Sequence, residues 1–334
     1  MTFEEMPQGA ILLVDKVEGW TSHDVVAKTR RALGTKKVGH AGTLDPMATG
    51  LLVLGAGPAT RLLTHLVGLD KTYTTTIRLG QSTVTDDREG DITATATPGS
   101  VAAVFAQPEL IAAGVAKLTG AIEQSPSAVS AIKVDGKRAY DRVRAGEDVV
   151  LKKRPVTIHA FEIGEPRLVS VAGPDGDPIN VIDIDAVVRC STGTYIRALA
   201  RDLGEDLGLG GHLTALRRSA VGPFSVDDAT AHAQLVGDAE TPGDPGTLHA
   251  PVTVARGLFS ELTLTPEEAR DLANGKRLAV DPERHAPAPL VAAILPADAG
   301  ERGPQDRLVG LVEIKGGRSR VVTNFPSQES EGAA

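Results

Sequence analysis

The sequence is poor in cysteine and in aromatic side chains. It contains one cysteine, Cys190, and aromatic residues make up 3% of its 334 positions. A single thiol excludes internal disulfides and zinc sites built from several cysteines. No apolar run approaches the roughly 18 residues that a membrane-spanning helix needs, and the first residues are acidic, unlike a basic leader. We therefore expect a globular protein that stays in the cytoplasm and crosses no membrane.

Nucleotide-binding and metal-binding motifs are also missing. The chain has no glycine-rich loop ending in Lys-Ser or Lys-Thr, and no His-Glu-x-x-His pattern. Residues 55–60 (GAGPAT) follow an apolar run and imitate the start of a dinucleotide-binding fingerprint, but they lack its third glycine and contain a proline. The sequence therefore predicts neither a cofactor nor a metal ion.

The net charge of −8 is distributed unevenly. Residues 226–334 carry a balance of −7, which leaves −1 for residues 1–225. Basic side chains of the first region are clustered, and such clusters can bind phosphates even where the regional total is near zero. The alternative is that each cluster is only a solvated surface. The candidate phosphate contacts are Lys133, Lys137, Arg138, Lys152, Lys153 and Arg154.

One carboxylate lies in a glycine-rich loop that runs into an apolar segment. Residues 39–52 read GHAGTLDPMATGLL. Pro46 disfavours helical geometry at Asp45, and three glycines permit backbone angles that other residues avoid, so the loop should be irregular and able to aim the carboxylate into a cleft. An isolated Asp-Pro pair is more often an ordinary surface turn in which the aspartate bonds its own backbone. The rest of the chain favours the first interpretation.

Residues 39–52, which we call the signature loop, are accompanied by six other short motifs in a fixed order. Together they resemble the bacterial tRNA pseudouridine synthases of the TruB type, which convert uridine 55 in the T-loop of tRNA to pseudouridine. The resemblance covers roughly residues 9–225, and several ordered matches are much harder to obtain by chance than one. The six motifs are LVDK (13–16), DKTY (70–73), RLG (78–80), SPSAVSAIK (125–133), GTYIR (193–197) and LRR (216–218).

The resemblance implies a set of catalytic residues. Asp45 occupies the place of the family's essential aspartate, which acts as nucleophile or base on the uridine. Arg197 matches the arginine that pairs with it, and a neighbouring guanidinium favours the ionised carboxylate that can attack. Tyr73 matches the ring that stacks against the target base, with a further role in proton transfer. The residues alone are also consistent with a structural ion pair for Arg197 and a core aromatic for Tyr73.

The resemblance also implies how the uridine is reached. A base inside a folded loop must be flipped out at a cost of roughly a few kcal/mol, and His40 matches the residue that enters the T-loop. The basic clusters then become candidate contacts with the RNA backbone. Without this context His40 is a turn residue, and core packing explains the apolar candidates equally well. The other candidate substrate-binding residues are Lys16, Gly42, Thr43, Lys71, Ile196 and Leu216.

Mixed strands and helices without a regular βαβ period predict an α+β fold with a mixed, largely antiparallel sheet flanked by helices. We expect a strand at 10–14, a helix at 22–33 with Thr21 as N-cap, and helices at 58–67 and 194–207. The resemblance implies the same fold. The predicted organisation is a pseudouridine synthase catalytic domain at 9–232, a linker at 233–252, a small β-rich PUA-like RNA-binding module at 253–326 and a disordered tail at 327–334.

Two other functions stay open at this point. One is an RNA-binding or tRNA-folding protein whose catalysis is dispensable, and the other is a guide-dependent pseudouridine synthase that acts on ribosomal RNA. Intact Asp45, Tyr73 and Arg197 argue against an inactive site, and the acidic C-terminal region favours an enzyme that works alone. We expect a monomer that binds the T-arm stem-loop of tRNA and isomerises uridine 55.

Overall fold

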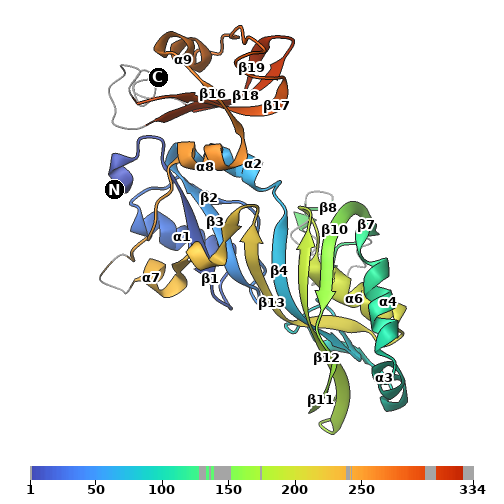
Figure 1. Cartoon of the computed structure of the whole chain (residues 1–334). Helices are drawn as coiled ribbons and strands as arrows, with labels where there is room; N and C mark the ends of the chain where they lie inside the picture. Colours follow the sequence, from blue (N-terminus) through green and yellow to red (C-terminus); the bar gives the residue numbers. More distant parts are fainter. Residues whose placement is uncertain are drawn as a thin grey trace.

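In the computed structural model, the chain forms one large sheet flanked by helices and a smaller sheet near the C-terminus (Figure 1). This arrangement confirms the predicted α+β class and the β-rich C-terminal part. The predicted tail at 327–334 lies outside the described residues. The structure describes residues 2–127, 133–134, 137–138, 152–173, 175–237, 241, 243–297 and 306–325.

The large sheet is mixed and mostly antiparallel, as predicted. Its strands are β1 (Ala10–Lys16), β2 (Val38–His40), β3 (Thr49–Ala56), β4 (Lys71–Leu79), β7 (Gly120–Gln124), β10 (Arg154–Ile163), β11 (Arg167–Ala172), β12 (Pro178–Cys190), β13 (Gly211–Val221), β14 (Phe224–Ser225) and β15 (Thr230–Ala231). The order is β15, β1, β3, β13, β4, β12, β10, β7, with β2 beside β3, β14 beside β13 and β11 beside β12. The β1–β15 and β3–β13 pairs are parallel.

The two halves of the sheet meet where β3 and β13 pair over two positions, Arg217 with Thr49 and Arg218 with Gly50. Gly50 has a φ of 98°, and a Cβ there would lie 2.3 Å from the carbonyl oxygen of Arg218, so only glycine fits. β3 begins within the signature loop, whereas β13 pairs along most of its length with β4. The junction therefore places the signature loop beside β4 and β13.

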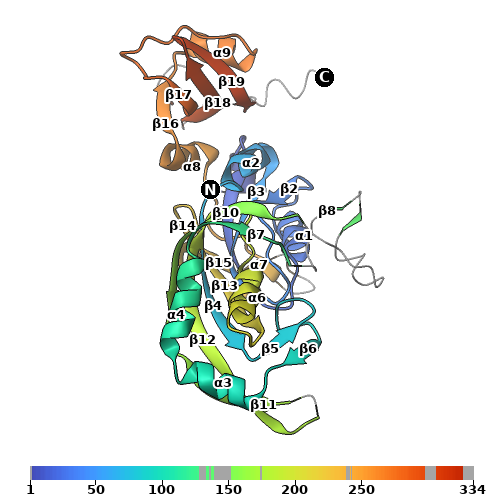
Figure 2. The same cartoon turned by 90° about the vertical axis from the view of Figure 1, so that its right-hand side faces the viewer.

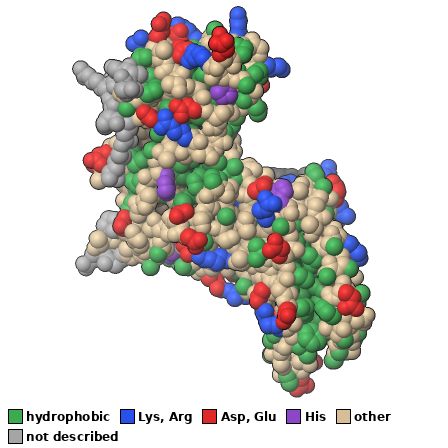
Figure 3. Space-filling model, viewed as in Figure 1, with side chains coloured by type: hydrophobic (Ala, Val, Ile, Leu, Met, Phe, Trp, Pro, Cys, Tyr) green, Lys and Arg blue, Asp and Glu red, His purple; other side chains and the backbone are tan. Residues whose placement is uncertain are grey.

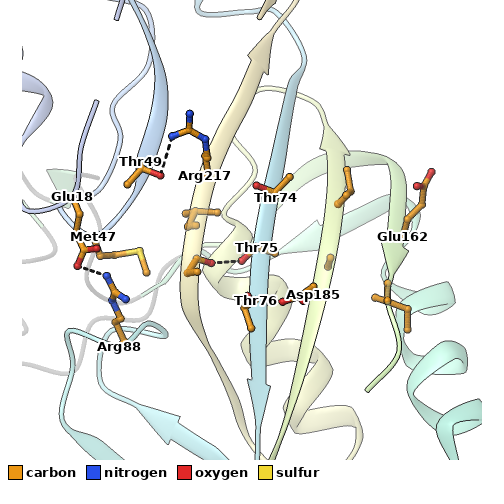
Figure 4. A pocket seen from close by; sticks show the side chains of 16 residues that line it. Glu18, Met47, Thr49, Thr74, Thr75, Thr76, Arg88, Glu162, Asp185 and Arg217 are labelled. Atoms are coloured by element: carbon orange, nitrogen blue, oxygen red, sulfur yellow. Dashed lines mark hydrogen bonds and ion pairs between the residues drawn. The ribbon is translucent and has the colours of Figure 1, made fainter. Parts of the chain in front are cut away.

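In the half of the sheet that contains β4 and β13, one face is covered by helices, and the side chains of β4 show why. Tyr73, Thr75 and Ile77 point to one side and are buried, whereas Thr74 and Thr76 point to the other. The helices on the buried side are α3 (Pro98–Phe105), α4 (Pro108–Lys117) and α6 (Ile196–Asp206). The opposite side is open, and Figure 4 shows the hollow of about 670 Å³ that crosses it. Figure 3 views the same side, where apolar side chains gather over the lower part of the sheet.

The helix after β1 forms as predicted. α1 spans Ser22–Ala32, and Thr21 and Asp24 form a capping box in which each side chain accepts a hydrogen bond from the other residue's amide.

No single helix in the described part of the chain is long and apolar enough to cross a membrane. α3 and α4 meet that test only as a pair, across a bend of 84°.

The helix predicted at 58–67 is a different structure. A 3-10 helix occupies Gly57–Leu62, and only one α turn follows, α2 at Leu63–Leu66. The hydroxyl of Thr60 donates a hydrogen bond of 2.8 Å to the carbonyl of Gly57, which competes with regular helical bonding. The prediction was therefore wrong in helix type and length, although the segment is helical.

A hairpin follows β4 and carries a loop toward α6. It consists of β5 (Gln81–Thr83) and β6 (Ile92–Thr95). Residues 84–91 between them, which we call the hairpin loop, fold back on the large sheet, where the amide of Leu213 donates to the carbonyl of Asp86 at 3.0 Å. This loop contributes to the site described below.

The small sheet, which Figure 2 shows above α2 and α8, belongs to a C-terminal module that begins with α8. Its elements are α8 (Pro251–Leu258), β16 (Ser260–Thr263), α9 (Pro266–Ala273), β17 (Ala288–Leu295), β18 (Arg307–Lys315) and β19 (Arg318–Asn324). Gln8 exchanges two hydrogen bonds of 2.6 and 3.0 Å with the backbone of Leu308. Phe325 is fully buried in an apolar cluster that includes residues of β1 and β3. The module is therefore docked on the large sheet through buried contacts.

The stretch predicted as a linker is partly structured. α7 occupies His232–Val236, and His249 forms a β-bridge with Ile11 of β1. Glycine and proline at 243–246 are typical of a linker, but the amide of Asp244 donates to the carbonyl of Gln234 at 2.9 Å, and His249 exchanges two backbone hydrogen bonds of 2.9 Å with Ile11. The predicted domain boundaries at 232 and 253 stay predictions.

Candidate active site

A cavity of about 260 Å³ lies where the signature loop, β4, β13 and the start of α6 meet. Two of the predicted substrate-binding residues, Lys16 and His40, do not line it. Arg218, for which the sequence suggested no role, does. The predicted residues that line the cavity are Gly42, Thr43, Asp45, Lys71, Tyr73, Ile196, Arg197 and Leu216.

Asp45 projects from a backbone turn in the signature loop. The amide of Ala48 donates to the carbonyl of Asp45 at 3.1 Å, which closes the turn after Pro46. One carboxylate oxygen, Oδ2, lies 3.0 Å from Nε of Arg197. The Asp45 side chain is 38% exposed whereas the Arg197 side chain is 5% exposed, so a reachable carboxylate is held by a buried cation.

Arg197 is itself fixed by the hairpin loop. Its Nη1 donates to the carbonyl of Thr85 at 2.7 Å and lies 3.3 Å from Oδ2 of Asp87. Asp87 is almost fully buried and also accepts hydrogen bonds from the Thr85 hydroxyl at 2.5 Å and the Glu89 amide at 3.0 Å. The guanidinium therefore bridges two carboxylates. No sequence pattern marks Asp87 as a site residue, because only the folding of the hairpin loop onto α6 brings it to Arg197.

Arg218 holds the signature loop from β13. Its side chain is buried, and it donates to the carbonyl of Leu51 at 2.8 Å through Nε and to that of Gly42 at 3.1 Å through Nη2. Tyr73 lies close to this arginine on the adjacent strand. Burial raises the pKa of the Tyr73 phenol, and the charge of Arg218 opposes the shift. At neutral pH the cavity therefore presents an uncharged phenol.

Lys16 lies beneath the signature loop. Its side chain is buried, and Nζ donates to the carbonyls of Trp20 at 2.7 Å, Val17 at 3.1 Å and Pro46 at 3.2 Å. Burial lowers the pKa of Lys16 to about 8, although the nearby charge of Asp45 opposes the shift. Because its ammonium group is occupied by backbone carbonyls, Lys16 supports the loop from below.

This buried lysine should give the folded protein a measurable pH dependence. An unfolded lysine titrates near 10.4, so between pH 8 and 10 the unfolded state binds more protons and the free energy of unfolding rises with pH. We expect Lys16→Met to flatten that rise by roughly 2–3 kcal/mol, measured by urea unfolding across this range. The exposed Lys36→Met is the matched control. Parallel curves for wild type and Lys16→Met would contradict the expectation.

Lys71 lines the cavity from the start of β4. Its Nζ donates to the carbonyls of Leu69 at 2.6 Å and Val67 at 2.9 Å, and lies 3.5 Å from the Thr192 hydroxyl. Burial lowers the pKa of Lys71 to about 8, and the charge of Arg218 contributes in the same direction. The aliphatic carbons of Lys71 form part of the cavity wall, and its ammonium group connects the segments that carry Val67, Leu69 and Thr192.

His40 lies beside the cavity. It ends β2 and is half-buried, with its ring in edge-to-face contact with that of His23 on α1 at 5.8 Å between centroids. Burial lowers the pKa of the His40 imidazole, and the neighbouring His23 and Arg218 act in the same direction. The ring is therefore neutral near pH 7.

The basic clusters are only partly described. Lys152 and Lys153 precede β10 and Arg154 begins it, and all three are exposed. The remaining three residues lie on a short pair of strands, and their side chains lie outside the described part of the structure. These strands are β8 (Lys133–Val134) and β9 (Lys137–Arg138). Among the described residues, no group of three or more His, Cys, Asp or Glu side chains is placed to hold a metal ion.

Comparisons with known proteins identify the family of this chain. The family described as TruB family pseudouridylate synthase (N terminal domain) matches residues 30–196, and the tRNA pseudouridylate synthase B C-terminal domain matches residues 197–241. A tRNA pseudouridine synthase B from Leifsonia xyli is 52% identical over 96% of this chain and 97% of its own length. The protein of that name from Arthrobacter sp. is 49% identical over 96% and 98%.

Solved structures share the fold. A chain in the crystal structure of a Cbf5-Nop10-Gar1 complex matches with a TM-score of 0.65 at 21% identity, over 98% of this chain and 88% of that one. A chain in an H/ACA RNP bound to a substrate RNA containing 2′-deoxyuridine matches with a TM-score of 0.63 at 20% identity, over 98% and 89%. The family matches and the near full-length identities decide the assignment: this chain belongs to the TruB family of pseudouridylate synthases.

Proposed function

We propose that this protein is a tRNA pseudouridine synthase that isomerises uridine 55 in the T-loop of tRNA. The observation that carries the proposal is the Asp45 carboxylate, held 3.0 Å from the Arg197 guanidinium in the wall of a cavity. The common name of relatives that match over nearly their whole length supports tRNA as the substrate. The T-arm stem-loop, a monomeric state and a cytoplasmic location are part of the same proposal.

The isomerisation needs one activated carboxylate. The bond between N1 and ribose C1′ breaks, the base turns, and a bond forms from C5 to C1′. N1 gains a proton and C5 loses one, so atoms and electrons balance without an added reactant. Asp45 supplies the nucleophile, either at C6 of the ring or at C1′. Arg197 fixes the direction of the Asp45 carboxylate, because its buried guanidinium lies 3.0 Å from Oδ2, and a reaction at one atom of the substrate requires such positioning.

The cavity offers the surfaces that a flipped uracil needs. Ile196 and Leu216 contribute apolar walls, and Tyr73 contributes an uncharged ring that stacks against the base. Gly42 and Thr43 line the cavity from the signature loop. His40, beside the cavity, enters the T-loop as the uridine leaves its stack, which offsets part of the flipping cost.

The first experiment measures tritium release from C5-labelled uridine in a synthetic T-arm hairpin, with purified protein and no added cofactor. Wild type should release tritium and Asp45→Ala should not. Release by the protein alone would exclude dependence on a guide RNA. Intact hairpin binding without release would instead support a guide-dependent enzyme or an RNA-folding protein.

The exposed basic cluster at 152–154 should contribute to RNA binding. Each duplex phosphate that the protein neutralises steepens the dependence of log affinity on log salt by about 0.9. We expect the charge-reversing triple variant Lys152→Glu, Lys153→Glu, Arg154→Glu to flatten this slope for a T-arm hairpin. Lys117→Glu, on α4, is the control at an exposed basic position. An unchanged slope in the triple variant would remove the cluster from the RNA footprint.

A further inference from the structure

Two successive carboxylates of the hairpin loop pair with two arginines of α6. Asp87 Oδ2 lies 3.3 Å from Nη1 of Arg197, and Asp86 Oδ2 lies 3.2 Å from Nη1 of Arg201. Residues four positions apart share one face of a helix, so the two ion pairs stack one turn apart along α6. Arg197 of the first pair also contacts Asp45. Neither residue of the second pair lines the cavity.

The backbone at Asp86 makes this double pairing possible. Side chains of successive residues in an extended chain point to opposite sides. Asp86 has a φ of 58°, and it is the one non-glycine residue with a positive φ in the described part of the chain. The left-handed conformation costs about 1–2 kcal/mol for most residues, and Asp tolerates it better than most. The turn allows both carboxylates to face α6, and neighbouring contacts must hold it.

Arg201 supplies such contacts. Its Nη2 donates to the carbonyl of Ser125 at 2.8 Å, and Nε and Nη2 donate to Oδ1 of Asp202 at 2.9 and 2.7 Å. Ser125 follows β7, so one guanidinium joins the hairpin loop, α6 and the end of β7. Burial raises the pKa of the Asp86 carboxyl, and the charge of Arg201 opposes this shift. Without Arg201, the loop would hold a buried carboxylate that has lost its cation, which favours its movement toward water.

We propose that Asp86 and Arg201 are positioning residues for the isomerisation, because their ion pair fixes the turn that allows Asp87 and the Thr85 carbonyl to aim Arg197 at Asp45. The inference rests on the proposed function. Neither positioning residue touches the substrate cavity, so their effect must pass through Asp87 and Arg197.

The test compares catalysis with binding and stability in the full-length protein. Asp86→Asn keeps the side-chain shape and still tolerates a positive φ, but it removes the negative charge. Arg201→Met removes the guanidinium. Both should lower the single-turnover rate of tritium release by about 10- to 100-fold, the scale of a small misplacement, with hairpin affinity within about twofold. Arg201→Lys keeps a charge without the fork and should be intermediate. The double variant should be no slower than the slower single variant, because both remove one interaction.

A third ion pair, at the end of the same helix, provides the control. Lys117 and Asp206 pair at 2.8 Å on the exposed side of α6, and Lys117→Met and Asp206→Asn should leave the rate unchanged. Wild-type rates in folded Asp86→Asn and Arg201→Met would overturn this inference and leave the proposed function intact. So would rate losses that follow equal losses of hairpin affinity or of folded protein, because the pair would then be purely structural. Wild type that releases no tritium would overturn the proposed function and this inference with it.

Discussion

Asp45→Asn is expected to abolish isomerisation while leaving affinity for a T-arm hairpin within about tenfold, or roughly 1.4 kcal/mol. Asparagine has nearly the same shape as aspartate but lacks the negative charge that makes the carboxylate a nucleophile. The exchange should not disturb the fold, because the Asp45 side chain is 38% exposed and the turn around it is closed by the backbone. Arg197 keeps its contacts with Thr85 and Asp87.

The matched control for this exchange is Asp185→Asn. Asp185 pairs with Arg167 at 2.6 Å on the open side of the sheet, and neither residue lines the cavity. Tritium release and hairpin affinity should both be unchanged in the control. If Asp45→Asn lost affinity instead of turnover, the signature loop would be a recognition element. Retained turnover would remove Asp45 from the chemistry.

Local patterns and recognisable motifs made much of this site predictable. The capping box at Thr21 and Asp24 fixes the start of α1, and it is encoded by two residues three positions apart. The pairing of Asp45 with Arg197 is a contact between distant segments, and the resemblance of two ordered motifs implied it before any geometry was known.

Other features depend on tertiary structure that no local pattern contains. β13 was not predicted, because register shifts between Leu213 and Ala215 and between Arg218 and Ala220 interrupt the alternation that identifies a strand. The role of Asp87 follows only when the hairpin loop folds onto α6. Lys16 lay in a matching motif, but its burial beneath Pro46 shows that it supports the loop and does not face the cavity.

Arg197→Met is expected to reduce both catalysis and stability, for separate reasons. The single-turnover rate should fall by about 10²–10³-fold, the scale seen when one preorganised charged or hydrogen-bonding group is removed from a reacting centre. The free energy of unfolding should fall by roughly 3 kcal/mol, because Asp87 would remain as a buried charge without its cation. Arg197→Lys should fall between wild type and Arg197→Met in rate, since a single ammonium cannot bridge Asp45 and Asp87 as the fork does.

The double variant Arg197→Met, Asp87→Asn separates these two effects. Removing the Asp87 charge should restore part of the stability measured by urea unfolding, because the unpaired buried carboxylate is gone. It should restore none of the rate, because Asp45 still lacks the guanidinium that orients it. Recovery of rate together with stability would mean that Arg197 contributes only to folding. Recovery of stability alone would show that one buried arginine serves two carboxylates, one for the fold and one for the reaction.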